Sequence, residues 1–314
     1  MKKLNYQELI KQYGIIVIFF SVVIILAIVS PTFRLPKNLL NVLKQASVNG
    51  ILAMGMAFTI ISGGIDLSMG SIVGLAGVGA ALFGHPGSPL IVPILIAILF
   101  GAIIGSINGF GVAYGGLPAF IITLGTMSIA RGLALVISGG VPVLGLSESF
   151  QEVAAGTTFS IPNLSYFLII IVLIMAFVLN KTVFGRRVYC IGGNATAAMV
   201  SGINVKRYLL GIYTISGILA GIAGFLMASR TNQGAPAMGV SYEMDAVTAA
   251  VIGGVSMTGG VGKWYGILIG ALFIAVIENG LTIFGVDPNS KQIVKGAIII
   301  VAVLLDVKSK GKKN

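Results

Sequence analysis

The feature that most constrains the fold is a series of apolar runs separated by short polar segments. Seven have roughly the length that a helix needs to cross the hydrocarbon core, about 17 to 25 residues. Three more are interrupted by glycines or polar residues. The clear runs are 15–30, 90–113, 118–138, 164–179, 209–227, 264–281 and 292–305, and the interrupted ones are 46–62, 67–83 and 245–257.

Composition identifies the solvent that these runs face. Of the 314 residues, 56% are hydrophobic and only 9% are charged, which is too little polar surface for a water-soluble globule of this size. We therefore predict an all-α integral membrane protein with about ten transmembrane helices, some short or broken. Residues 1–314 form a single multi-pass transmembrane domain in this prediction.

Charge patterning predicts that both termini and one long loop lie in the cytoplasm. Ten crossings place both termini on one side, and the positive-inside rule assigns that side to the cytoplasm. The acidic loop 139–163 then lies outside. Arg34, Lys37 and Lys44 also fall outside and count against this topology. The basic residues that support it are Lys2, Lys3, Lys11, Lys181, Arg186, Arg187, Lys206, Arg207, Lys308, Lys310, Lys312 and Lys313.

Glycines recur at helical spacing within several apolar runs. Such ladders predict close packing of helices, because small residues let backbones approach in lipid. The alternative is that a ladder lines a narrow pathway, and both interpretations remain open. The ladders are Gly101, Gly105 and Gly109; Gly217, Gly221 and Gly224; Gly70 and Gly74; and Gly266 and Gly270.

Charged residues inside apolar runs are functional candidates, because ionisable groups are costly in a bilayer. Asp66 is expected either to cap a helix beginning at Leu67 or to line a polar pathway. Glu278 and Asn279 either face the bundle interior or mark the end of a span. Arg131 requires a carboxylate or carbonyl partner, and an ion pair is favoured over a ligand contact.

Glu243 and Asp245 open the short run that begins near residue 245. Acidic groups at this point complement the positive end of a helix dipole. We predict that they are helix caps, with contact to a partner as the less favoured alternative.

Missing motifs narrow the source of energy for transport. The chain has no phosphate-binding loop, no HExxH and no GxSxG, so we predict no ATPase, catalytic site, metal or cofactor of its own. Its net charge of +11 reflects topology signals and not nucleic-acid binding. Two mechanisms remain: a gradient-driven carrier that uses Asp66 or Glu278, or a subunit that docks on a partner ATPase.

A docking element is present in the polar loop 181–207. Asn194 can cap a short helix over residues 195–201, and Gly202 can end it in a left-handed conformation.

Four segments then identify a family. They are SVNGILAMGMAFTIISGGIDLSMGS (47–71), GGNATAAMVSGINV (192–205), SYEMDAVTAAVIGGVSMTGG (241–260) and QIVKGAIIIVAVLLD (292–306). In this order and spacing, the chain resembles the membrane permease subunits of bacterial ABC importers for monosaccharides. The resemblance covers nearly the whole length and is closest to permeases for ribose.

The resemblance implies that residues 1–314 are a single transmembrane permease domain, multi-pass in the bacterial cytoplasmic membrane. It also implies a second permease copy, cytoplasmic ABC ATPase subunits, an extracytoplasmic sugar-binding protein and surrounding membrane lipid. The 181–207 loop would hold the coupling helix, with Thr196 where the family often has Glu. Ribose leads as substrate, followed by other pentoses, hexoses and the furanosyl autoinducer sugar. The implied ATPase-coupling residues are Gly193, Asn194, Thr196, Ala197, Ala198 and Gly202.

A neutral sugar needs hydroxyl and amide partners along its route. The residues that we predict to line this route are Ser62, Asp66, Ser68, Asn108, Thr248 and Asn279.

Overall fold

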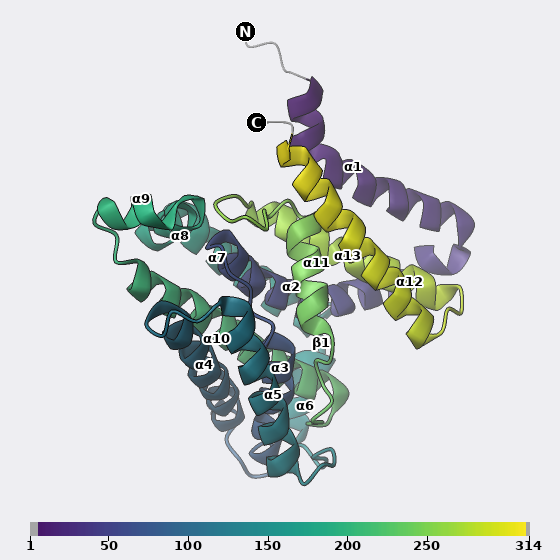
Figure 1. Cartoon of the computed structure of the whole chain (residues 1–314). Helices are drawn as coiled ribbons and strands as arrows, with labels where there is room; N and C mark the ends of the chain where they lie inside the picture. The colour runs from purple at the N-terminus through teal and green to yellow at the C-terminus, as the bar shows by residue number, and fades with distance from the viewer. Residues whose placement is uncertain (1–5, 312–314) are drawn as a thin grey trace.

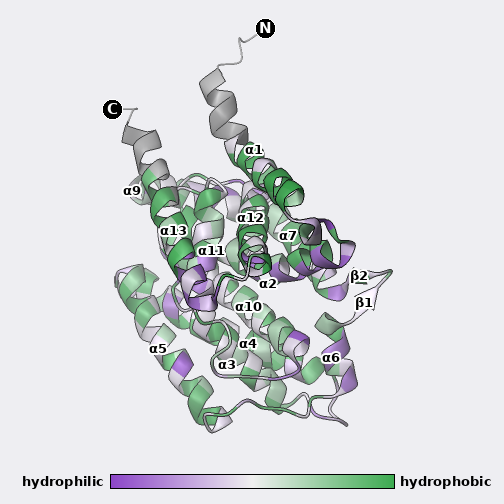
Figure 2. Ribbon diagram, turned by 90° about the vertical axis from the view of Figure 1, so that its right-hand side faces the viewer, coloured by the Kyte–Doolittle hydropathy of each residue, from purple (hydrophilic) through white to green (hydrophobic). Residues whose placement is uncertain are grey.

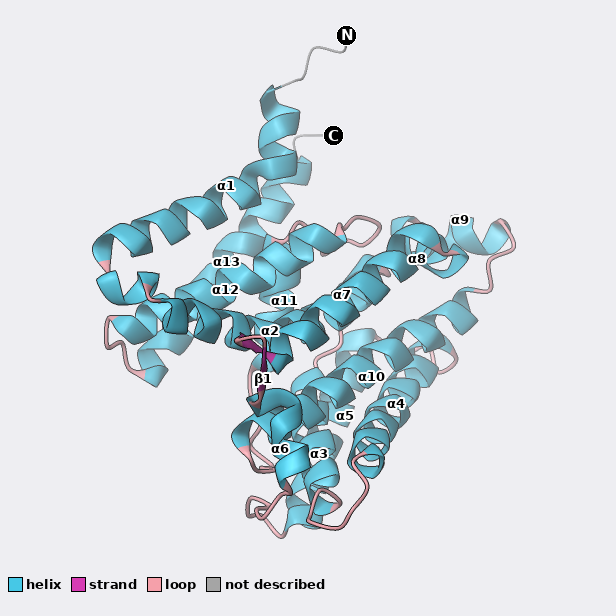
Figure 3. Cartoon of the chain, turned by 180° about the vertical axis from the view of Figure 1, so that it is seen from behind, coloured by secondary structure: helices cyan, strands magenta, loops and turns pink. Residues whose placement is uncertain are grey.

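A computed structural model describes the chain from residue 6 to residue 311, with side chains described at 14–301, 303 and 304. This part of the chain is almost entirely helical (Figure 3), which confirms the predicted all-α class. The helices are α1 (Tyr6–Val29), α2 (Pro36–Ile61), α3 (Met69–Leu82), α4 (Ile91–Ala113), α5 (Ala119–Ser138), α6 (Glu148–Ala155), α7 (Asn163–Lys181), α8 (Val183–Gly193), α9 (Ala195–Val200), α10 (Val205–Thr231), α11 (Tyr242–Ile252), α12 (Trp264–Ile283) and α13 (Pro288–Gly311).

Five of these helices, α4, α5, α7, α10 and α12, are long and apolar enough to cross a membrane by length and composition. Figure 2 shows hydrophobic residues along most of the helices. Each of the ten predicted runs overlaps one helix. The number of full crossings and the side of the termini stay predictions. Of the terminal lysines behind that topology, Lys2, Lys3, Lys312 and Lys313 lie outside the described residues, as do the side chains of Lys11, Lys308 and Lys310.

The centre of the molecule is α2, which is buried from Ala46 to Ile61. It contacts α10, α12, α11 and α7, while α10 also packs along α4 and α3 (Figure 1). The structure begins α2 at Pro36, ten residues before the predicted run, because the polar stretch around Lys37 and Lys44 is helical too. A short 3-10 helix, Pro31–Arg34, connects it to α1.

Three of the four glycine ladders pack helices together as predicted, in two helix pairs. A Cβ atom on Gly101 would overlap the carbonyl oxygen of Gly217, so α4 and α10 touch through their backbones. Likewise, a Cβ atom on Gly270 would overlap the carbonyl oxygen of Ala249, which joins α12 to α11. These contacts confirm the packing interpretation for both pairs. The ladder at Gly70 and Gly74 behaves differently.

The loop between α5 and α7 is more ordered than the sequence indicated. It contains α6 and a hairpin of β1 (Thr157–Thr158) and β2 (Ile161–Pro162), whose turn residues both have positive φ. Ser229 of α10 holds α6 in place, since its hydroxyl accepts from the N–H of Ala154 at 2.9 Å and donates to the carbonyl of Phe150 at 2.6 Å.

Candidate functional site

Asp66 lies in the break between α2 and α3, and its side chain is fully buried. Its Oδ1 accepts from the backbone N–H and the hydroxyl of Ser68, at 3.1 and 2.6 Å. Its Oδ2 accepts from the hydroxyl of Ser216 on α10 at 2.8 Å. The following helix begins at Met69 and not at Leu67. Asp66 therefore bonds the turn that leads into α3 and not the first helical turn, which corrects the predicted cap.

Two further side chains extend this network into α4 and α5. The Asn108 amide donates to the Ser68 hydroxyl at 2.8 Å and, more weakly, to Asp66 Oδ1 at 3.4 Å. Its carbonyl oxygen accepts from Thr126 at 2.6 Å. We call Asp66, Ser68, Asn108, Thr126 and Ser216 the Asp66 cluster. All five are at most 3% exposed, and the carboxylate has a donor on each oxygen.

Sequence reasoning identified three members of this cluster and missed Thr126 and Ser216. Single hydroxyls in apolar helices give no signal of their own, because a helix can satisfy them internally. The hydroxyl of a helical Ser or Thr, such as Thr126, can donate to the backbone carbonyl four residues earlier in its own helix. Only the packing of α4, α5 and α10 brings these two hydroxyls to the break.

The other predicted pathway residues lie apart from this cluster, although all three are buried. Ser62 donates to the carbonyl of Thr59 at 2.8 Å, and Thr248 donates to that of Met244 at 2.6 Å. Asn279 of α12 exchanges two amide hydrogen bonds of 2.9 Å with Asn38 of α2. The six predicted residues therefore do not form one site.

Glu278 faces the interior of the bundle and has an ionic partner that sequence reasoning missed. Lys295 of α13 pairs with Asp245 of α11 at 2.9 Å and also with Glu278 of α12. The signal was available, because Lys295 is a lone cation in an otherwise apolar run. This triad joins three helices, and it places Asp245 in an ion pair and not only in a helix cap.

Arg131 and Glu243 lie close together beside α3. Arg131 donates from Nη1 to the carbonyls of Pro236 and Met238, the latter at 2.9 Å, and from Nη2 to the carbonyl of Gly70 at 3.3 Å. The predicted partner is therefore a set of carbonyls, and the favoured ion pair does not form. Glu243 lies in the first turn of α11, as predicted.

The 181–207 loop folds into α8 and α9. The Asn194 side chain accepts from the backbone N–H of Ala197 at 2.9 Å and caps α9, while Gly202 follows it with a φ of +80°. Both features agree with the sequence prediction. Met199 and Val200 on α9 are 62% and 85% exposed, so this short helix presents apolar side chains outward.

Backbone contacts connect α8 to the end of α2. A Cβ atom on Gly192 would overlap the carbonyl oxygen of Ile61, which also accepts from the N–H of Gly260 at 2.8 Å. Tyr189 donates to the carbonyl of Gly262 at 2.8 Å, and burial raises the pKa of its phenol, so the donor stays protonated. The loop carrying α9 thus touches the residue one position before the break.

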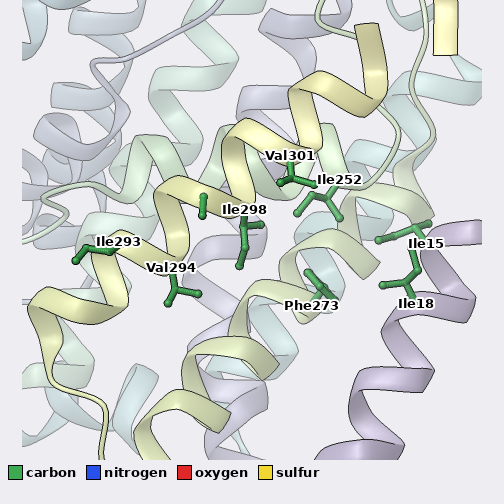
Figure 4. Close-up of a pocket in the computed structure, with 9 residues that line it drawn as sticks. Ile15, Ile18, Ile252, Phe273, Ile293, Val294, Ile298 and Val301 are labelled. Atoms are coloured by element: carbon green, nitrogen blue, oxygen red, sulfur yellow. The ribbon is translucent and has the colours of Figure 1, made fainter. Parts of the chain in front are cut away.

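An apolar cavity near the termini of the described chain does not suit a polar ligand. It measures about 490 Å³ between α1, α11, α12 and α13, and its lining in Figure 4 is entirely aliphatic or aromatic. A sugar placed there would lose its hydrogen bonds to water without replacement, a penalty of several kcal/mol.

Comparisons with known proteins identify a permease. A family described as "Branched-chain amino acid transport system / permease component" matches residues 38–303. The chain is 40% identical over 309 residues to the ribose import permease protein RbsC of Bacillus subtilis, covering 98% of this chain and 96% of the relative. No solved structure matches the chain significantly.

Relatives from other organisms carry two different sugar names. The ribose import permease protein RbsC of Escherichia coli K12 is 38% identical over 305 residues, covering 96% of this chain and 94% of the relative. The galactose/methyl galactoside import permease protein MglC of the same strain is 39% identical over 325 residues, covering 98% and 97%.

Proposed function

Because this chain belongs to the permease-component family of branched-chain amino acid transport systems, we propose that it is the transmembrane permease of an ABC importer for a monosaccharide. It works with a second permease copy, cytoplasmic ATPase subunits and an extracytoplasmic sugar-binding protein. Ribose is the first candidate substrate, since the ribose permeases are matched over nearly their full length. Galactose is the second, because the galactoside permease is almost equally similar.

The observation that carries this proposal is the geometry of the 181–207 loop. Its helix α9 exposes Met199 and Val200, which gives an ATPase an apolar surface to contact. Gly192, two residues before Asn194, rests on Ile61 at the end of α2. Displacement of α9 on ATP binding would therefore press directly on the helix that ends beside the α2–α3 break. Such an element, with two arrangements biased by ATP, is what alternating access requires.

The coupling residues differ in what they contribute. Asn194 and Gly202 shape α9, while Ala198 faces inward and is buried. Gly193 and Ala197 are small residues that let a partner approach. Thr196 stands where the family often has Glu, so contact here relies on shape and apolar surface more than on charge.

A gradient-driven carrier that uses Asp66 or Glu278 is the alternative. Such a carrier needs a carboxylate that can release its proton or ion during each cycle. Both of these carboxylates have partners: Glu278 pairs with Lys295, and Asp66 accepts from Ser68 and Ser216. The partnered state of both groups favours the ATPase-driven mechanism.

The test is uptake of labelled ribose into vesicles that hold the permease with its ATPase and binding protein. We expect uptake to require ATP and both partners, and galactose competition to report the substrate preference. Uptake driven by an imposed proton gradient, with this chain alone, would overturn the proposal in favour of the carrier.

Gly192→Ala tests the coupling route. A methyl group there overlaps the carbonyl oxygen of Ile61, so we expect ATP hydrolysis to persist while uptake falls roughly tenfold. Gly125→Ala, on the exposed side of α5, is the control, because nothing lies within 4 Å of a Cβ atom at that position. Equal uptake by the two variants would contradict transmission through Gly192.

A further inference from the structure

A second polar region lies beside α5. It is a cavity of about 490 Å³ between α3, α5 and the start of α11. Most ligand sites for small molecules measure about 300 to 1,000 Å³, so a monosaccharide fits. Its polar and small lining residues, which define the Glu243 pocket, are Ser71, Ser128, Arg131, Gly132, Ser241 and Glu243.

The glycine ladder at Gly70 and Gly74 forms the floor of this pocket. A Cβ atom on Gly70 would overlap Glu243 Oε2, and one on Gly74 would lie 2.7 Å from Arg131 Nη1. The ladder therefore admits two charged side chains and the backbone of residues 236–239 against α3, where the other ladders admit a neighbouring helix.

Two polar groups in the pocket can take a further hydrogen bond. The Ser71 hydroxyl lines the cavity and makes no hydrogen bond within the described residues, and it is not sealed from solvent. In the same part of the chain, the half-buried Glu243 carboxylate forms no ion pair within 4 Å and receives no hydrogen bond from another side chain, although its own backbone N–H and the nearby charge of Arg131 stabilise it. A ligand with hydroxyl groups would add hydrogen bonds to both groups.

The arrangement of charge favours a neutral ligand over a zwitterion. Arg131 already donates to three backbone carbonyls, which occupies most of the donors that a ligand carboxylate would need. Glu243 remains open as an acceptor. Hydroxyl groups of a sugar can donate to this carboxylate and to Ser71, and can accept from Ser241.

We propose that the Glu243 pocket is a monosaccharide-contact site of the translocation route, with the Glu243 carboxylate and the Ser71 hydroxyl as its hydrogen-bonding groups. This inference deepens the proposed function, on which it rests. It replaces the dispersed set of predicted pathway residues by one cavity. The pocket opens toward α5, whose exposed glycines leave room beside it.

A thiol-protection experiment tests this site without relying on transport. On a Cys190→Ser background, Gly132→Cys places a thiol in the pocket, and nothing lies within 4 Å of a Cβ atom there. Gly125→Cys is the matched control, since it is an equally open α5 glycine outside the pocket. The assembled complex is treated with a small maleimide in ribose, galactose or leucine.

We expect ribose or galactose to slow alkylation at position 132 several-fold and to leave position 125 unchanged. Adding Glu243→Gln should raise the sugar concentration for half-protection roughly tenfold, because a charge-assisted hydrogen bond weakens. Protection by leucine alone, equal effects at both positions, or protection unchanged by Glu243→Gln would each overturn the site. Loss of ATP-driven uptake in the unmodified chain would overturn the proposed function instead, while sugar protection would still report the pocket.

Discussion

The Asp66 cluster and the Glu243 pocket are both polar regions within apolar helices, yet their hydrogen bonding is opposite. Asp66 is fully buried and has donors on both carboxylate oxygens. Glu243 is half-buried, lines a cavity and has no ionic partner among the described residues. A carboxylate in a membrane protein therefore indicates function only when its partners are known, since the same group can also fasten a break in a helix.

Asp66→Ala should give the largest effect. It tests whether the Asp66 cluster stabilises the fold. Removing the carboxylate leaves the donors of Ser68 and Ser216 without this acceptor, while the Asn108 amide keeps its bond to the Ser68 hydroxyl. We expect the free energy of unfolding to fall by about 3 kcal/mol. Thermal unfolding in detergent measures this, with the exposed Glu152→Ala as control. Unchanged stability would mean that the cluster does not hold the break.

Glu243→Gln tests the role of the Glu243 pocket. It should lower transport and leave the stability of the fold nearly unchanged. The amide keeps the shape of the side chain but weakens its bond to a sugar hydroxyl. We expect ATP-driven uptake to fall roughly tenfold, with stability changed by less than about 0.5 kcal/mol. Glu152→Gln makes the same chemical change at an exposed position on α6 and should leave uptake unaltered. A loss of stability equal to that of Asp66→Ala would erase the distinction between the two regions.

Thr126→Val tests the part of the Asp66 cluster that lies furthest from the carboxylate, the bond between Thr126 and Asn108. The change removes the 2.6 Å hydrogen bond to the Asn108 carbonyl oxygen and leaves that buried acceptor unpaired. We expect stability to fall by about 1 kcal/mol. The matched control is Thr123→Val, one turn earlier, whose hydroxyl bonds only carbonyls of its own helix. Equal melting temperatures for both variants would argue that Asn108 is not held by Thr126.

Ser71→Ala should give the smallest effect. It should slow transport without changing the stability of the fold. The hydroxyl makes no hydrogen bond to the residues that the structure describes, so its removal leaves none of their polar groups unsatisfied. We expect unchanged stability and roughly threefold slower uptake, the range of one neutral hydrogen bond. Ser138→Ala, on the exposed end of α5, serves as control. Lower stability of the Ser71→Ala variant would show that Ser71 stabilises the fold, and would contradict its role in contacting the sugar.

Much of the helical fold was predictable, because apolar runs of membrane-spanning length fix where helices form. The α9 helix was predictable too, since Asn194 and Gly202 act locally through capping and left-handed backbone. The start of α2 was not, because Lys37 and Lys44 interrupt hydrophobicity without interrupting the helix. The elements α6, β1 and β2 were also missed, as short outer elements carry little hydropathy signal.

The site was less predictable, because its residues come together only through packing. Asp66 was identified by its charge, but Thr126 and Ser216 share no sequence signal with it. Glu243 was interpreted as a cap because it begins a helix. That interpretation could not anticipate that Gly70, on a distant helix, leaves room for its carboxylate. A glycine ladder looks the same in sequence whether it meets a helix or a charged side chain.

In the proposed importer, the contact between Gly192 and Ile61 would separate the choice of ATPase from the transport machinery. The contact consists of backbone atoms, whereas the surface that α9 would offer to an ATPase consists of side chains such as Met199 and Val200. Side chains of residues 195–200 could then change while the link to α2 stays the same. A graft of this six-residue helix would redirect the proposed partnership without a redesign of the route.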